Sequence, residues 1–261
     1  RYLPKKWKEN CEEERLLGVS LTGIMDNKLT NGTYQTNEAL GEMLEELKRE
    51  AIQTNKVWSE KLGIPQSTAI SCVKPSGTVS QLCDSASGIH ARHSDYYIRT
   101  VRGDNKDPIT QMMIDQGVPN EPDVMKPDTN TVFSFPIKSP PGSLTRDSLS
   151  AIEQLEIWKV YQDNWCEHKP SVTISVKEDE WIEVGNWVNS NFENISGISF
   201  LPYSDHVYKQ APYQDCTEEE YLELLDKMPE LDWSKLSDYE KEDYTSASQE
   251  FACTANACEV L

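Results

Sequence analysis

The residues best suited to chemistry lie in one stretch, residues 71–82, which reads Ser-Cys-Val-Lys-Pro-Ser-Gly-Thr-Val-Ser-Gln-Leu. The apolar run over 68–73 predicts a buried strand. Pro75 and Gly77 predict a tight turn after it, with hydroxyl side chains at positions 76, 78 and 80. A turn that leads into a helix offers unpaired backbone N–H groups and the positive end of the helix dipole. With the hydroxyls, these donors would suit a phosphate.

Two interpretations of this turn compete. Gly77 has no Cβ, so a ligand could approach the backbone closely. Alternatively, one of the Ser or Thr residues merely caps a helix. The stretch lacks the Gly-Lys-Ser/Thr ending of a Walker P-loop, so the local pattern alone favours capping.

A second candidate is the pair Cys253 and Cys258, separated by four residues close to the end of the chain. A disulfide between them would close only a tiny loop, and two thiols are too few for a zinc site. Exposed thiols on a flexible arm suit a redox relay, which exchanges with a buried disulfide and is reduced outside. The alternative is that these cysteines are incidental.

Other polar residues carry weaker signals. His90 and His93 are spaced like a helical ligand pair, but no third ligand is nearby, so a metal site is not expected. Arg92, Arg99 and Arg102 make the most basic local stretch. They are either paired surface arginines, or one of them reaches an anionic ligand.

Composition limits the function classes. The chain has 261 residues with 37% hydrophobic residues, enough for a substantial core. The net charge of −19 argues against nucleic-acid or anionic-membrane binding, and no apolar run approaches the ~20 residues of a membrane helix. The seven cysteines form no disulfide framework, which suits the cytoplasm. Because the first residue is Arg1, we expect a fragment or a processed product.

The pattern of elements predicts an α/β protein. A long amphipathic helix over 37–62, capped by Thr36, precedes the strand at 68–73. Further helices are expected over 107–117, 144–164, 181–192 and 217–228, and strands over 96–98, 131–137, 170–176 and 197–201. This alternation favours a largely parallel sheet or barrel, where ligands bind at the carboxyl ends of strands. The segment from 234 to 250 is acidic and poor in aliphatic residues, so we expect it to be mobile.

Taken together, these pieces resemble a known family. Residues 73–82, continuing into Gly-Ile-His-Ala-Arg at 88–92, closely resemble the carboxyl half of adenosylcobalamin-dependent (class II) ribonucleotide reductases. The resemblance is strongest to the monomeric ribonucleoside-triphosphate reductases. The stretches 96–102, 155–176 and 197–214 look similar too, and the Cys-x4-Cys ending resembles that family's shuttle dithiol.

The resemblance implies a fold and a division of the chain. The fold would be the later part of a ten-stranded α/β barrel with a mobile acidic C-terminal tail. Residues 1–205 would form the carboxyl half of the barrel, 206–233 an acidic extension, and 234–261 a flexible tail carrying the dithiol.

The resemblance also implies site residues. Ser76, Gly77, Thr78, Val79 and Ser80 would hold the substrate's phosphates. Cys253 and Cys258 would re-reduce the active-site disulfide and be reduced in turn by thioredoxin. The adenosylcobalamin contacts cannot be placed residue by residue, and no metal ligand is assigned.

The family's thiyl-radical motif, Asn-Pro-Cys-x-Glu-Ile, is absent here. It would lie in a missing amino-terminal part, and this portion would be inactive alone.

The expected function is therefore a share of ribonucleotide reduction, in which ribonucleoside triphosphates become 2′-deoxyribonucleoside triphosphates for DNA replication. This portion would anchor the substrate and regenerate thiols. The alternative is a non-catalytic nucleotide-binding or assembly module with an idle tail. The turn's position after a buried strand, in a chain that ends in a dithiol, favours phosphate binding over capping.

Overall fold

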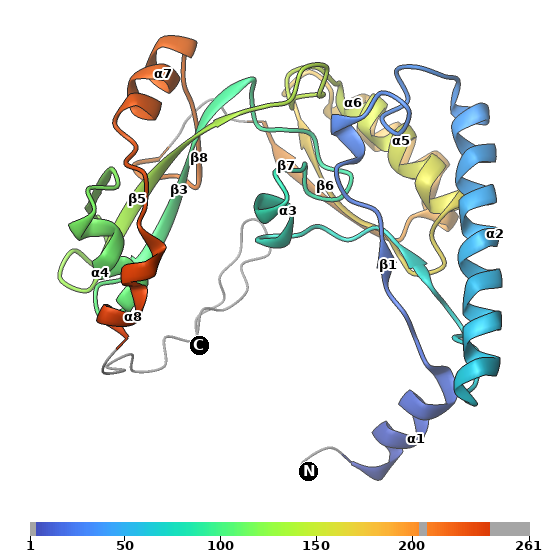
Figure 1. Ribbon diagram of the computed structural model, residues 1–261. Helices are drawn as coiled ribbons and strands as arrows, with labels where there is room; N and C mark the ends of the chain where they lie inside the picture. The colour runs from blue at the N-terminus through green and yellow to red at the C-terminus, as the bar shows by residue number, and fades with distance from the viewer. Residues whose placement is uncertain (1–3, 204–207, 241–261) are drawn as a thin grey trace. The chain divides into compact units, whose positions relative to one another are not determined.

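The structure is a computed structural model that describes residues 4–203 and 208–240. The chain forms two compact units, shown in Figure 1. Unit 1 comprises Arg1–Arg92 and Pro141–Tyr203, and unit 2 comprises His93–Pro140 and Ser204–Leu261.

Unit 1 contains the candidate turn. Its helices are α1 (Lys5–Glu14), the short η1 (Ile24–Asp26), α2 (Asn37–Leu62), α3 (Val79–Leu82), α5 (Ala151–Asn164), α6 (Trp181–Ser190) and η2 (Phe192–Asn194). Its strands are β1 (Val19–Ser20), β2 (Ser71–Cys72), β6 (Ser171–Val176) and β7 (Gly197–Pro202). They form two parallel pairs, β1 with β2 and β6 with β7.

The two long helices of unit 1, α2 and α5, each begin directly after a residue whose side chain caps the helix. The predicted helix over 37–62 is confirmed as α2, and the Thr36 hydroxyl accepts a hydrogen bond from the Ala39 N–H. The predicted helix over 144–164 begins later, at Ala151. Ser150 and Glu153 form a capping box, which satisfies the first backbone donors and fixes the start of α5 there.

The core of unit 1 lies where α5 packs on α2 and β6. Leu155, Trp158 and Tyr161 of α5 are fully buried in one cluster with Leu40 and Leu44 of α2. Alternate residues of β6 point into the same cluster, as the period of two along a strand requires. This packed layer is the rigid body to which the candidate turn is attached.

Unit 2 differs from the sequence prediction. Its strands are β3 (Tyr96–Asp104), β4 (Asn120–Pro122), β5 (Asn130–Lys138) and β8 (Tyr213–Asp215). They form an antiparallel sheet in the order β4-β5-β3-β8, so the largely parallel sheet was wrong for this part. β3 and β5 pair over nine positions, from Tyr96↔Lys138 to Asp104↔Asn130, which the predicted strand of three residues did not indicate.

The helices of unit 2 are α4 (Pro108–Asp115), α7 (Glu218–Asp226), η3 (Trp233–Lys235) and α8 (Leu236–Tyr239). The last two lie around residue 234, where the flexible tail was predicted to begin. Gln116 exchanges two hydrogen bonds with the backbone of Asp232, and the Tyr239 hydroxyl donates to Asp115. These contacts tie the segment to α4. The remainder of the predicted tail, from residue 241, lies outside the described residues.

The mixed α/β class is thus confirmed. Three separate sheets are found among the described residues, and the ten-stranded barrel stays a prediction.

The strand that enters the candidate turn is anchored by two other segments of the chain. One edge of β2 pairs with β1. In addition, Glu167 accepts hydrogen bonds from the backbone N–H groups of Ile70 and Ser71, and the Trp165 indole donates to the Cys72 carbonyl at 2.8 Å. A two-residue strand has little stability of its own, so these contacts hold β2 in place.

The segment that returns from the turn is anchored by a buried arginine. Arg92 is only 4% exposed, and its guanidinium donates two hydrogen bonds of 2.9 Å to the Asp26 carboxylate. It also donates to the Asp84 carboxylate at 3.2 Å and the Asp84 carbonyl at 2.7 Å. Burial would raise the pKa of the Asp26 carboxyl, but hydrogen bonds from Arg92, the Ala86 N–H and Ser143 outweigh burial and lower that pKa.

This arrangement predicts a pH-dependent stability. Asp26→Asn should lower the free energy of unfolding of the chain at pH 7 by about 3 kcal/mol, because a buried guanidinium loses its main counter-charge. Since the folded pKa of Asp26 is depressed, its contribution is fully present above the ordinary aspartate pKa. It is lost as the pH falls through the lowered value. Urea unfolding at pH 7 and pH 3 measures both effects.

Asp84→Asn is the matched control, because the Asp84 side chain is 71% exposed and its ion pair is screened by water. It should cost less than about 1 kcal/mol at pH 7. Equal losses in the two variants would contradict the role given to Asp26.

Candidate functional site

The five predicted phosphate residues are consecutive: three follow β2 and the last two, Val79 and Ser80, begin α3. We call this segment the 76–80 turn (residues 76–80). Two of its three hydroxyl residues hold the turn itself. The Ser76 hydroxyl accepts a hydrogen bond from the Ser80 N–H, and the Ser80 hydroxyl donates to the Ser76 carbonyl, both at 2.9 Å. Ser80 is buried. The Ser76 hydroxyl thus satisfies a donor in the first turn of α3, a structural role of the kind that the capping interpretation expects.

The middle of the turn is different. Gly77, Thr78 and Val79 are exposed, and within the described residues their three backbone N–H groups donate no hydrogen bond. The Thr78 hydroxyl likewise has no partner among the residues that the structure describes, and it does not cap α3. Three consecutive amides and one hydroxyl are thus available to an acceptor outside the described chain.

Gly77 is not required by the fold around it. A Cβ at this position would meet no atom within 4 Å, and its φ is not in the left-handed region. Gly88, on the returning segment, is required: its φ is +57°, and a Cβ there would lie 2.8 Å from the Lys74 carbonyl oxygen. The close approach of Gly88 presses the returning segment against the start of the turn.

The helix dipole contributes less than the sequence suggested. α3 has only four residues, so few peptide dipoles are aligned. Positive charge near the turn comes from Lys74, whose ammonium donates to the Lys169 carbonyl and to the Ser171 hydroxyl at 3.0 Å. An anion at this turn would therefore be held mainly by hydrogen bonds from the turn's free donors.

The three arginines of the basic stretch are engaged in the protein. Arg92 is buried against Asp26 and Asp84. Arg99 donates to the Pro212 carbonyl and stacks on a tyrosine ring, and Arg102 pairs with Asp123. Their contacts support the structural interpretation over the anion-binding one.

The two histidines belong to different units and do not form a ligand pair. His90 contacts the backbone of Ser87 and Thr173 in unit 1, whereas His93 stacks on Tyr213 in unit 2. Within residues 4–203 and 208–240, no cluster of three or more His, Cys, Asp or Glu side chains could hold a metal ion.

The predicted shuttle cysteines, Cys253 and Cys258, lie outside the described residues. The five other cysteines are free thiols. Burial raises the pKa of the Cys166 thiol to about 12, and it also raises the pKa of Cys216. A high pKa disfavours the reactive thiolate, so these two cysteines suit packing better than exchange chemistry.

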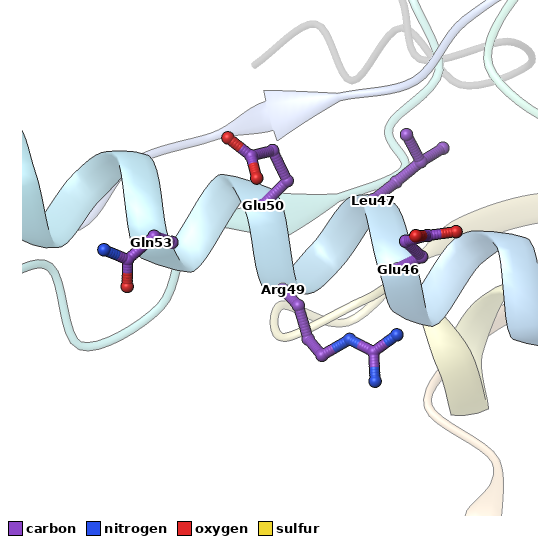
Figure 2. Close-up of a pocket in the computed structure, with 5 residues that line it drawn as sticks. All are labelled: Glu46, Leu47, Arg49, Glu50 and Gln53. Atoms are coloured by element: carbon purple, nitrogen blue, oxygen red, sulfur yellow. The ribbon is translucent and has the colours of Figure 1, made fainter.

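A shallow hollow on α2, shown in Figure 2, is a poor candidate for a site. It is lined by Glu46, Leu47, Arg49, Glu50 and Gln53. All five side chains project from the same helix, so no second element encloses a ligand.

Sequence reasoning missed the residues that fix the turn and its returning segment by hydrogen bonds. Asp26, Ser87 and the buried state of Arg92 emerge only from contacts between distant segments. The Gly-Ile-His-Ala-Arg run at 88–92 was the one local signal that pointed to them.

No helix in the described part of the chain combines the length and apolar character needed to cross a membrane.

No protein-family model matches the sequence, but individual proteins do. The chain is 31% identical to an adenosylcobalamin-dependent ribonucleoside-triphosphate reductase of Euglena gracilis, over 87% of this chain and 31% of the relative. It is 29% identical to a probable enzyme of that name from Dictyostelium discoideum, over 95% of this chain and 32% of the relative. A Lactobacillus delbrueckii enzyme of the same name is 26% identical over 84% of this chain.

A comparison with solved structures finds the same kind of protein as the sequence comparison. The crystal structure of a B12-dependent (class II) ribonucleotide reductase superposes with a TM-score of 0.76 at 23% identity, covering 91% of this chain and 36% of that one. The chain thus spans about one third of the length of the relatives that it matches. These matches confirm the predicted family: the chain is homologous to part of the adenosylcobalamin-dependent ribonucleoside-triphosphate reductases.

Proposed function

We propose that this chain is the substrate-anchoring and thiol-regenerating portion of a class II ribonucleotide reductase. The whole enzyme would convert ribonucleoside triphosphates to 2′-deoxyribonucleoside triphosphates. The proposal is supported by the names of the relatives, which are adenosylcobalamin-dependent ribonucleoside-triphosphate reductases. The free thiols of the described cysteines suit a reducing cytoplasm as its location.

The observation that carries the proposal is the set of unpaired donors at Gly77, Thr78 and Val79. Phosphate oxygens are strong acceptors, and hydrogen bonds to a charged acceptor are shorter and stronger than neutral ones. A Cβ built at Gly77 would meet no atom of the described chain within 4 Å, so no neighbour requires a glycine there. The missing Cβ instead leaves room for a phosphate beside the backbone. In this proposal, Ser76 and Ser80 shape the 76–80 turn, and the three middle residues bind.

The chemistry attributed to the whole enzyme is a two-electron reduction. A thiyl radical would abstract the 3′ hydrogen of the ribose, and the 2′ hydroxyl would leave as water. A pair of active-site thiols would supply the two electrons and become a disulfide. Adenosylcobalamin would supply the radical. We assign none of its contacts to residues of this chain.

Cys253 and Cys258 would close the cycle. Their thiols would reduce the active-site disulfide by thiol–disulfide exchange and become a disulfide themselves. Thioredoxin would then reduce that disulfide. The spacing of the two cysteines near the end of the chain supports this role.

The remaining two thirds of the reductase would need a surface on this chain, and α2 offers one. Its apolar stripe is buried at Leu40 and Leu44 but continues uncovered, with Leu47, Trp58 and Leu62 exposed by 46%, 53% and 63%. We propose that the amino-terminal part of the reductase covers this half of α2, because the relatives are about three times as long as the match.

The first prediction concerns the phosphate donors. Thr78→Ala should raise the KM for the ribonucleoside triphosphate, in the enzyme assembled with its amino-terminal part, because a hydrogen bond to a charged group is worth about 1.5–3 kcal/mol. Gly77→Ala should raise KM as well, by blocking the approach of the phosphate. Neither change should lower the melting temperature of the chain.

Two matched controls accompany these variants. Thr54→Ala removes an exposed threonine hydroxyl on α2, and Gly185→Ala adds a methyl group at a helical glycine with open space around it. Both should leave KM unchanged. An unchanged KM in Thr78→Ala and Gly77→Ala would refute the phosphate role.

The second prediction concerns the shuttle. The double variant Cys253→Ser, Cys258→Ser should abolish turnover driven by thioredoxin, because the active-site disulfide can no longer be reached. Dithiothreitol, a small reductant, should partly restore turnover. Cys11→Ser, which removes an exposed thiol elsewhere, should behave like the unaltered chain. Full thioredoxin-driven turnover in the double variant would rule out the shuttle.

The third prediction concerns assembly. Trp58→Glu and Leu62→Glu should weaken binding of the amino-terminal part by at least tenfold, because each places a charge on a surface that becomes buried. Isothermal titration calorimetry measures the affinity. Ile182→Glu, a change at an exposed residue of α6, is the control. If the two α2 variants instead abolish self-association of the chain and leave that affinity intact, the surface binds a second copy and the proposal is wrong.

A further inference from the structure

A single hydroxyl, that of Ser87, fixes both polar groups of the Ser76 backbone. The Ser87 hydroxyl oxygen accepts a hydrogen bond from the Ser76 N–H at 2.7 Å. The same hydroxyl donates to the Ser76 carbonyl oxygen at 2.9 Å. Ser76 immediately precedes the unpaired amides, and its own hydroxyl holds the Ser80 N–H. The orientation of the peptide that enters the 76–80 turn therefore depends on Ser87.

His90 holds Ser87 in turn, and its two contacts determine its protonation. Nδ1 lies 3.0 Å from the Ser87 carbonyl oxygen, which can only accept, so Nδ1 carries the proton. Nε2 lies 3.0 Å from the Thr173 backbone nitrogen, which can only donate, so Nε2 is unprotonated. Both contacts together require the neutral Nδ1–H form. Burial, which lowers the pKa of His90, favours the same form.

The contact with Thr173 connects the turn to the rigid core of unit 1. Thr173 lies in β6, between Val172 and Ile174, which are both buried, and it is paired with Ser199 of β7. A continuous series of hydrogen bonds thus runs from β6 through His90 and Ser87 to Ser76. It is separate from the Arg92 contacts, which hold the other side of the returning segment.

We propose that Ser87 and His90 are positioning residues, which fix the 76–80 turn so that its unpaired amides are preorganised for a phosphate. This inference rests on the proposed phosphate role of the turn and extends it to residues that do not touch the ligand. Preorganised donors bind more tightly because less order is lost on binding. Loss of either side chain should therefore weaken phosphate binding without removing any donor.

The test uses the 261-residue chain, with inorganic tripolyphosphate as the probe and backbone amide NMR as the readout. In Ser87→Ala, the Ser76 amide should exchange with solvent at least about tenfold faster, since its hydrogen-bond acceptor is gone. The dissociation constant for tripolyphosphate should rise about tenfold. Ser87→Thr keeps the hydroxyl and should restore both values to within about threefold.

His90 is tested in the same way. His90→Leu removes both ring nitrogens and should weaken tripolyphosphate binding, whereas His90→Asn keeps a donor near the Nδ1 position and should recover part of the affinity. His168→Gln alters a histidine that contacts the Leu17 carbonyl, away from the turn, and should change neither readout. In the unaltered chain, the imidazole nitrogen shifts should report a protonated Nδ1 and an unprotonated Nε2.

The outcomes separate the two proposals. If the unaltered chain does not bind tripolyphosphate, the phosphate role fails, and the exchange rates and imidazole shifts still decide whether Ser87 and His90 hold the turn. If Ser87→Ala leaves the Ser76 exchange rate and the affinity unchanged, the positioning role is refuted. A protonated Nε2 in the unaltered chain refutes it too, even if Ser87→Ala or His90→Leu fails to fold.

Discussion

The fold around the candidate site depends on one buried cation. The Arg92 guanidinium is almost fully enclosed and donates hydrogen bonds to Asp84, eight residues earlier, and to Asp26, 66 residues earlier. A buried charge is tolerated only when it is paired and hydrogen-bonded, so these three segments must stay together for the unit to fold. The Asp26 carboxylate also accepts from the Ala86 N–H and the Ser143 hydroxyl. One acidic side chain thus fixes the returning segment from which Ser87 and His90 reach the turn.

The site has two layers with different tasks. Ser76, Ser80 and Ser87 use their hydroxyls within the protein, and they give the turn its shape. The Thr78 hydroxyl and the N–H groups of Gly77, Thr78 and Val79 donate no hydrogen bond within the described chain. Water satisfies exposed amides at the start of a helix until a ligand displaces it, so these three donors are open to an anion. This division supports an anchor for an anionic ligand rather than a catalytic group.

Sequence reasoning predicted the local features well. The helix over 37–62 follows from its apolar stripe, Thr36 and Gly63, and the structure confirms it. The start of α5 could have been found from the Ser-x-x-Glu pattern at 150–153, which marks a capping box. The antiparallel pairing of β3 and β5 could not be found in this way, because alternation in a strand carries no information on the direction of its partner. The roles of Ser87 and His90 were also hidden, because they depend on contacts across the unit rather than on spacing.

Reconstitution tests whether this chain completes a ribonucleotide reductase. The purified chain is mixed with the separately expressed amino-terminal part, adenosylcobalamin, a ribonucleoside triphosphate, thioredoxin and its reducing system, and the 2′-deoxy product is quantified. We expect product from the mixture and none from either part alone. No product from a mixture in which the two parts are shown to associate would contradict it, and so would full activity of the amino-terminal part without this chain.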